Sequence, residues 1–112
     1  VSHCTGLSAE AAVEAHLVAR GARPVARRWR GAGGEIDLIL EEAGVIVFVE
    51  VKHGRDFATA TRRIGPAQQA RLFAAAETFL GTLAGGTLRD CRFDVALVDG
   101  QGRIEIVENA FL

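Results

Sequence analysis

Two acidic residues and the only lysine of the chain lie in two consecutive apolar segments. Asp37 is part of the alternating segment Glu35–Glu41, and Glu50 and Lys52 close the very apolar segment Val45–Lys52. Alternation of side chains along a strand would place all three on one face of a sheet if the two segments pair. Their types and spacing therefore raise the question of which register brings them together.

A tight turn between the two segments would fix that register. If Ala43-Gly44 is a two-residue turn, counting outward along an antiparallel pair places Asp37 directly opposite Glu50 and Glu35 opposite Lys52. Directly opposed side chains lie only ~5 Å apart at Cβ. A slip of one residue would move Asp37 to the other face and separate the group.

Opposed carboxylates in an apolar strand pair repel each other, and a buried, uncompensated charge is costly. A divalent cation between Asp37 and Glu50 would remove the conflict, and Mg²⁺ (or Mn²⁺) prefers such oxygen ligands. Lys52 could then orient or deprotonate an attacking water, or stabilise the charge of a reacting phosphate. The alternative is structural, because most acidic-x-lysine pairs on strands are solvated surface pairs.

Length and composition describe one globular domain. The 112 residues are 49% apolar and 24% charged, which predicts a single domain over residues 1–112. The longest strongly apolar run, Val45–Val49, is too short to cross a bilayer, so we expect no membrane span and no signal peptide. Cys4 and Cys91 lack a CxxC spacing, which favours free thiols and a cytoplasmic location.

Charge is distributed unevenly although the net charge is only −1. Arginines cluster in two stretches, and acidic residues gather between Glu35 and Glu50. Basic surfaces beside an acidic centre suit a protein that contacts phosphates around a cation. The alternative is that arginine is simply the preferred solubilising residue of this chain. The candidate nucleic-acid contacts are Arg30, Arg55, Arg62, Arg63 and Arg71.

Hydrophobic periodicity predicts two helices and five strands in a layered α/β domain. The predicted helices are Leu7–Arg20 and a helix from Pro66 to about Leu80, with a loop over His53–Thr61. The predicted strands are Pro24–Arg30, Glu35–Glu41, Val45–Lys52, Arg92–Val98 and Arg103–Val107. In the second strand, strict alternation would place Ile36, Leu38 and Leu40 on one face and Glu35, Asp37 and Ile39 on the other. Trp29 is expected to pack on the core edge in preference to stacking on a base.

The motifs Gly34-Glu35-Ile36-Asp37-Leu38-Ile39 and Val47-Phe48-Val49-Glu50-Val51-Lys52 closely resemble those of the YraN-like family. That family is assigned to the PD-(D/E)XK nuclease superfamily. The resemblance spans about residues 6–98, and it includes Trp29-Arg30 and the late segment Arg92-Phe93-Asp94-Val95. It implies a restriction-endonuclease-like three-layer fold, with a central mixed β-sheet flanked by helices.

The resemblance also implies roles at the matching positions. Asp37 and Glu50 would be metal ligands, with a backbone carbonyl of Val49 or Val51 as a further ligand, and Lys52 would be the catalytic lysine. Glu10, on the first helix, would be an auxiliary acid that reaches the metal directly or through water. The implied activity is metal-dependent hydrolysis of phosphodiester bonds, in DNA more than in RNA.

The first helix matches the family more loosely, with Ala9 in place of a glycine and Val13 in place of an alanine, and three further positions depart from the family pattern. Gly54 replaces an arginine, with Arg55 one place later, Gln68 replaces a lysine, and Arg28 stands where asparagine is common. These departures leave two further hypotheses open: a non-catalytic nucleic-acid-binding module with the same fold, and a purely structural or protein-interaction domain. A homodimer is compatible with a domain of this size.

Overall fold

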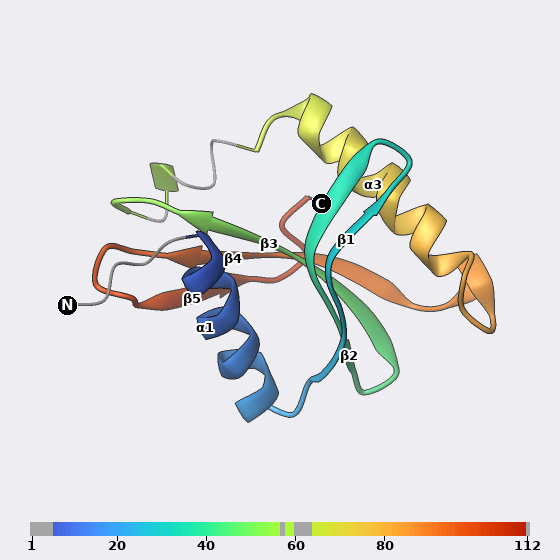
Figure 1. Ribbon diagram of the computed structural model, residues 1–112, viewed down its shortest axis with the longest axis horizontal. Helices are drawn as coiled ribbons and strands as arrows, with labels where there is room; N and C mark the ends of the chain where they lie inside the picture. Colours follow the sequence, from blue (N-terminus) through green and yellow to red (C-terminus); the bar gives the residue numbers. More distant parts are fainter. Residues whose placement is uncertain (1–5, 57, 60–63, 112) are drawn as a thin grey trace.

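The computed structural model of the chain describes residues 6–56, 58–59 and 64–111. Within these residues, five strands form one sheet in the order β1-β2-β3-β4-β5, and the helices α1 and α3 lie against it (Figure 1). The helices are α1 (Gly6–Ala19) and α3 (Pro66–Leu80), with a short 3₁₀ helix η1 (Gly86–Leu88). The strands are β1 (Arg23–Gly31), β2 (Gly34–Glu42), β3 (Val45–His53), β4 (Cys91–Val98) and β5 (Ile104–Val107).

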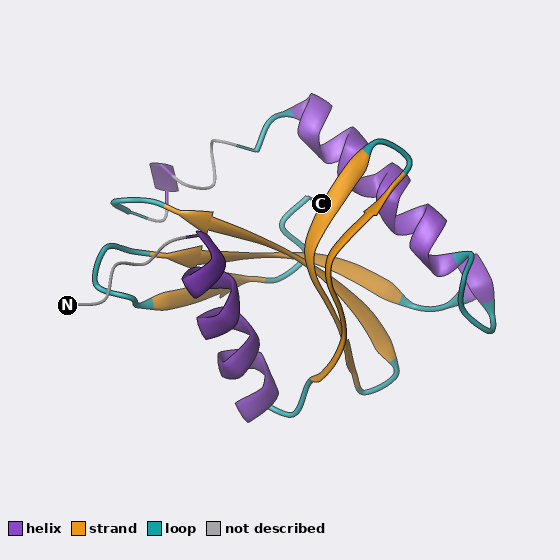
Figure 2. Cartoon of the chain, in the orientation of Figure 1, coloured by secondary structure: helices purple, strands orange, loops and turns teal. Residues whose placement is uncertain are grey.

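The sheet is mixed. Strand β3 runs parallel to β4, and the other neighbouring pairs are antiparallel (Figure 2). A parallel pair needs a long crossover connection, and α3 lies in the segment that joins β3 to β4. Strand β3 therefore occupies the centre of the sheet, where its continuous apolar sequence is required.

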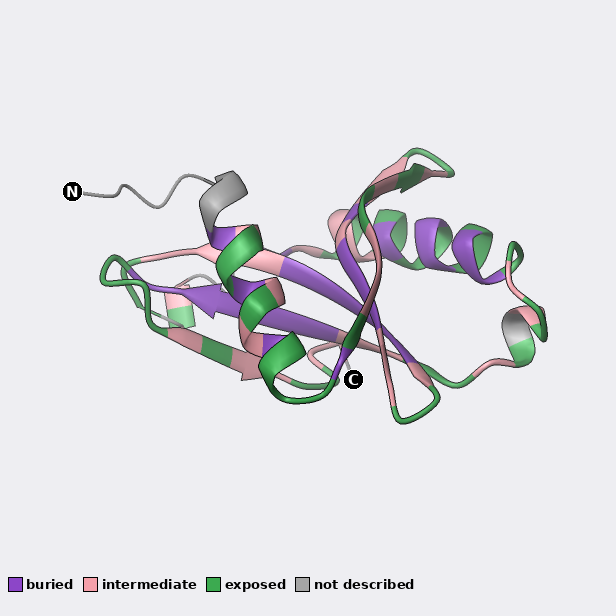
Figure 3. Ribbon diagram, turned by 60° about the horizontal axis from the view of Figure 1, so that its bottom comes forward, coloured by how far each residue is buried: buried purple, intermediate pink, exposed green. Residues whose placement is uncertain are grey.

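Each face of the sheet carries one helix, which gives three layers. On one face α1 packs Val13 and Leu17 against Leu38 and Val49 of the central strands. On the other face α3 packs its buried side chains against a second set that includes Phe48. Residues 46–50 of β3 are all buried, as expected for a strand covered on both sides (Figure 3).

The α/β class and the order and types of the predicted helices and strands are confirmed. The predicted loop over His53–Thr61 is wrong in part, because His53 is the last residue of β3 and residues 58–59 are helical. Helix α3 begins at Pro66, where proline suits the first helical turn, and it ends before Gly81. Trp29 packs edge-on against Phe79 of α3, with ring centroids 5.3 Å apart, so it packs as expected. No helix among the described residues is long and apolar enough to span a membrane.

The predicted alternation along β2 is wrong at one point. Leu38 and Leu40 face α1 as one set, but Ile36 lies with Ile39 in the α3-side core, so the alternation breaks at Asp37. The ladder of β1 and β2 continues through the pairs Arg27–Leu38 and Trp29–Ile36. Between these pairs Arg28 has a φ of 50°, which no regular strand contains. The closed end of the β1–β2 hairpin lies beside α3 (Figure 1).

Candidate active site

Strands β2 and β3 pair in the predicted register and then separate. The ladder runs from Glu42–Val45 to Leu38–Val49, which confirms the two-residue turn at Ala43-Gly44. Pairing ends there. The β1–β2 hairpin rises toward α3 while β3 continues beside β4 (Figure 1). The candidate site lies where the two strands diverge.

Asp37 lies at this divergence. Its Oδ2 atom accepts a hydrogen bond from the backbone N–H of Val51 at 2.8 Å. The Asp37 side chain thus replaces the backbone acceptor that the Val51 N–H would have had if β2 and β3 had continued to pair. The predicted opposition of Glu35 and Lys52 is wrong, because Glu35 pairs instead with Arg30, to which it also forms an ion pair of 2.6 Å.

Glu50 is a buried acid with two side-chain partners. It is only 8% exposed, and its Oε2 atom accepts a hydrogen bond from Nε2 of Gln68 at 2.6 Å. The Nζ atom of Lys52 lies 3.3 Å from the same oxygen. Burial raises the pKa of Glu50 to about 8, and the negative charge of Asp37 adds to that shift, while Lys52 opposes it.

These residues fit a hard divalent cation by the chemistry of their donors. Asp37 and Glu50 line one pocket of about 230 Å³ and interact with each other, so a cation between them would relieve the repulsion. Among the described residues, no group of three His, Cys, Asp or Glu side chains is arranged as a complete metal cage. Mg²⁺ usually binds through one or two carboxylates and keeps several waters, so two carboxylates suffice.

Residues 9–98 match the uncharacterised protein family UPF0102. The chain belongs to this family. A UPF0102 protein of Ruegeria pomeroyi is 54% identical over 110 residues, which cover 98% of this chain and 89% of that relative. A UPF0102 protein of Cereibacter sphaeroides is 53% identical over 112 residues, covering 99% of this chain and 95% of the relative. The resemblance to the YraN-like family is thereby confirmed at the level of the family.

In this UPF0102 protein, Glu10 lies near the acid pair but in a different pocket. It is half-buried on α1, and burial and then Asp37 raise its pKa, while Arg28 lowers it. Glu10 lines the groove between α1 and β1, whereas Asp37 and Glu50 line the pocket on the side of α3. The structure gives Glu10 no direct contact with Glu50, so its role as an auxiliary acid stays a prediction.

The predicted nucleic-acid contacts fall into three groups. Arg71 lines the same pocket as Asp37 and Glu50. Arg30 and Arg55 are exposed, but Arg30 forms an ion pair with Glu35. The remaining two, Arg62 and Arg63, lie outside the described residues.

Two residues near the site were not predicted to serve it. Gln68 was noted in the sequence only because it replaces a lysine of the family pattern, yet it donates a hydrogen bond directly to Glu50. Arg28 was noted as part of the first basic stretch and as a replaced asparagine, yet the pairs Arg27–Leu38 and Trp29–Ile36 place it across from Asp37 on β1. For Gln68 the available signal was its position in the first turn of a helix that must cover the end of β3.

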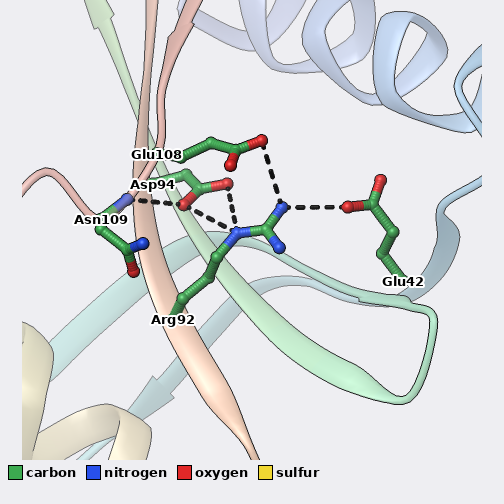
Figure 4. A network of polar contacts seen from close by, with 5 residues as sticks. All are labelled: Glu42, Arg92, Asp94, Glu108 and Asn109. Carbon is green, nitrogen blue, oxygen red and sulfur yellow. Dashed lines mark hydrogen bonds and ion pairs between the residues drawn. The ribbon is translucent and has the colours of Figure 1, made fainter.

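The late motif Arg92-Phe93-Asp94-Val95 forms a separate network. The guanidinium of Arg92 contacts Asp94, Glu42 and Glu108, and Asp94 also accepts a hydrogen bond from the backbone N–H of Asn109 (Figure 4). Asp94 is 2% exposed, and burial raises its pKa. The network joins the β2–β3 turn, β4 and the segment after β5, so this motif stabilises the fold and does not extend the acid pair.

Proposed function

We propose that this protein is a metal-dependent endonuclease that hydrolyses phosphodiester bonds in DNA, with a restriction-endonuclease-like fold of the PD-(D/E)XK type. The observation that carries the proposal is the arrangement of Asp37, Glu50 and Lys52 where β2 and β3 diverge. An acid pair in which burial raises the pKa of Glu50, the Lys52 ammonium beside that carboxylate and an adjoining pocket together fit metal-assisted phosphoryl transfer.

The chain supplies the ligands and the neighbouring charge. Asp37 and Glu50 would hold Mg²⁺ or Mn²⁺ through carboxylate oxygens, and a backbone carbonyl of Val49 or Val51 is the further candidate. When bound, such an ion polarises the phosphate and lowers the pKa of water. The hydrogen bond from Val51 fixes the carboxylate of Asp37, and Gln68 fixes that of Glu50.

Lys52 would act on the attacking water or on the phosphate. Its side chain is 24% exposed and its Nζ atom lies 3.3 Å from Glu50 Oε2, so the ammonium is held beside the acid pair and remains accessible to a substrate. An ammonium there stabilises the negative charge that develops on the phosphate, and it orients the attacking water. Glu10 is the auxiliary acid, acting from α1.

The test is a cleavage panel with purified full-length chain, Mg²⁺ or Mn²⁺, and linear, nicked, branched and single-stranded DNA. Wild type is expected to cut at least one form, and Lys52→Ala to lose most of that activity. Glu105→Gln is the control for loss of an exposed charge, because Glu105 lies on β5 and is separated from β3 by the whole of β4. A wild-type protein that neither binds Mn²⁺ nor cuts any of these DNA forms refutes the proposal.

A second candidate is a nucleic-acid-binding module without turnover. Two features favour it: the net charge of −1, and a hydrogen bond from neutral Gln68 where the family pattern has lysine. This function predicts that DNA binding persists in Asp37→Asn and that wild type cuts nothing. The cleavage panel therefore separates the two candidates.

A further inference from the structure

A groove of about 340 Å³ lies between α1 and β1, on the opposite side of β2 from the acid-pair pocket. We call it the α1–β1 groove. Its apolar walls include Ala11 and Ala15 of α1 and Leu38 of β2. In Figure 1, α1 and β1 diverge upward from the loop that joins them. Nothing in the proposed chemistry of Asp37 and Glu50 uses this groove.

The ionisable groups in the groove leave one arginine unpaired. Arg27 donates two hydrogen bonds of 2.6 Å to Glu14, so these charges neutralise each other. Arg28, the next residue, also lines the groove, and its guanidinium has no hydrogen bond or ion pair among the described residues. The remaining ionisable group, Glu10, interacts electrostatically with Asp37 as well as with Arg28.

The contrast along β1 makes Arg28 distinctive. Arg23 is paired with Glu41, Arg27 with Glu14 and Arg30 with Glu35. Arg28 is the one arginine of β1 that the described structure leaves without such a partner. An exposed guanidinium that makes no hydrogen bond to a carboxylate keeps its donors available for a phosphate, which it can bind through two parallel hydrogen bonds.

Arg28 also connects the groove to the acid pair. The pairs Arg27–Leu38 and Trp29–Ile36 flank it, so it lies across the β1–β2 ladder from Asp37. Leu38, in the groove wall, directly follows Asp37 in the chain. Glu10, which lines the groove, interacts electrostatically with Asp37 of the acid-pair pocket, so the two sites adjoin around the edge of β2. A DNA strand with one phosphate at Asp37 and Glu50 can therefore reach the groove with a neighbouring nucleotide.

We propose that the α1–β1 groove binds one unpaired nucleotide of the DNA strand, with Arg28 contacting its phosphate and the apolar walls contacting its sugar and base. This inference rests on the proposed function, and it names the substrate class as DNA with a single-stranded segment. A volume of about 340 Å³ is at the small end of ligand sites, which suits one nucleotide and excludes a duplex.

The test measures binding, separately from cleavage. Binding is measured by fluorescence anisotropy, with the full chain titrated into a labelled short oligothymidylate or a labelled duplex of equal length. Each titration is carried out once in EDTA and once in Ca²⁺. Arg28→Ala removes the phosphate contact. Ala15→Leu narrows the groove without changing the charge, and position 15 is an exposed helical site that tolerates leucine. Arg23→Ala is the matched control, because it removes the same charge from the far end of β1.

Arg28→Ala is expected to weaken binding of the single strand by about tenfold, as for the loss of a charged hydrogen bond. Ala15→Leu should weaken it by roughly threefold or more, and Arg23→Ala by less than about twofold, because only a distant charge is lost. The affinity for the duplex should be the same in Ala15→Leu as in wild type.

Three results would overturn the inference: no binding of the single strand by wild type in either buffer, equal losses in Arg28→Ala and Arg23→Ala, or full affinity in Ala15→Leu. The proposed function fails on a different result, the absence of cleavage with Mn²⁺. If the protein binds the single strand through Arg28 but cuts no DNA, the proposal for the α1–β1 groove stands and the proposed nuclease activity is refuted.

Discussion

Asp37 on β2 accepts a hydrogen bond from the backbone N–H of Val51 on β3 at 2.8 Å, at the point where these strands cease to pair. One carboxylate therefore has two tasks. It caps a backbone donor that would otherwise lose its partner, and it faces Glu50 as a candidate metal ligand. Substitutions at Asp37 can separate the two tasks, because one depends on an oxygen acceptor and the other on negative charge.

Asp37→Asn is expected to abolish metal-dependent cleavage while leaving the fold stable. The amide oxygen can still accept from Val51, and the repulsion with Glu50 disappears. Asp37→Ala should lose cleavage as well, and should lower the free energy of unfolding by about 1–3 kcal/mol because the Val51 N–H loses its acceptor. Urea unfolding at neutral pH measures the difference. Equal stability of the two variants would show that the hydrogen bond contributes little.

The raised pKa of Glu50 predicts that the free energy of unfolding of the metal-free protein depends on pH in an unusual way. Its folded-state pKa of about 8 lies above the ordinary value of 4.5, so the folded protein holds a proton that the unfolded chain releases. This contribution is fully present below about pH 4.5 and is lost as the pH rises through about 8. Between these values the free energy of unfolding should fall, with a slope of at most about 1.4 kcal/mol per pH unit.

The contribution of Glu50 is isolated by comparison with Glu50→Gln. The pKa values of Asp94 and Glu10 are also raised, and those of Glu41 and Asp99 are lowered. The pH dependence of wild-type stability therefore contains contributions from several carboxyl groups besides Glu50. The variant should lose the slope between pH 6 and 8, measured by urea unfolding in EDTA at several pH values, with both proteins in the same buffers. Parallel curves for the two proteins would mean that Glu50 titrates normally. If Glu50 is a metal ligand, Mn²⁺ should raise the Tm of wild type more at pH 8 than at pH 6, because the ion binds the deprotonated carboxylate. Mn²⁺ should leave the Tm of Glu50→Gln unchanged at both pH values.

The sequence predicted the strand register because a two-residue turn leaves only one pairing between two apolar segments. It could not predict that the ladder stops at Leu38, since the hydrophobic pattern continues through Ile36. The stop depends on the positive φ of Arg28 and on packing of the hairpin against α3, which are tertiary effects. For the same reason Asp37 and Glu50 were correctly brought together, whereas Glu35 was assigned the wrong partner.

Gln68 is expected to control metal affinity through Glu50. Its amide holds Oε2 at 2.6 Å, and loss of such a supporting hydrogen bond typically weakens metal binding by about 10-fold or more. Gln68→Ala should therefore raise the Kd for Mn²⁺, measured by titration calorimetry, by about tenfold. Gln69→Ala is the matched control, because Gln69 follows in the chain and instead donates to the carbonyl of Ile64. An equal Kd in the two variants would exclude Gln68 from the site.

Arg92 is expected to stabilise the fold without affecting the acid pair. Its removal leaves the buried carboxylate of Asp94 without its cation, a change that costs about 3–5 kcal/mol when a buried pair is broken. Arg92→Ala should lower the urea midpoint strongly, and Arg92→Met combined with Asp94→Leu should recover much of the loss. Where the single variant still folds, Mn²⁺ affinity should be unchanged, and a weakened affinity would connect this network to the site.

Gly34 forms the wall between the hairpin and α3, and we expect any side chain there to open the acid-pair pocket. A Cβ at this position would lie 2.5 Å from the backbone oxygen of Arg71, which cannot move without displacing the helix. Gly34→Ala should therefore cost roughly 1–3 kcal/mol of stability, as overpacking does, and should also weaken Mn²⁺ binding because Gly34 and Arg71 border the same pocket as Asp37. Gly100→Ala is the control, since a Cβ there meets nothing within 4 Å and its φ is not positive. The clash acts on the backbone of α3. A Gly34→Ala protein with wild-type stability and wild-type Mn²⁺ affinity would therefore show that the hairpin and α3 are not rigidly packed. The metal site would then not depend on the contact between Gly34 and Arg71.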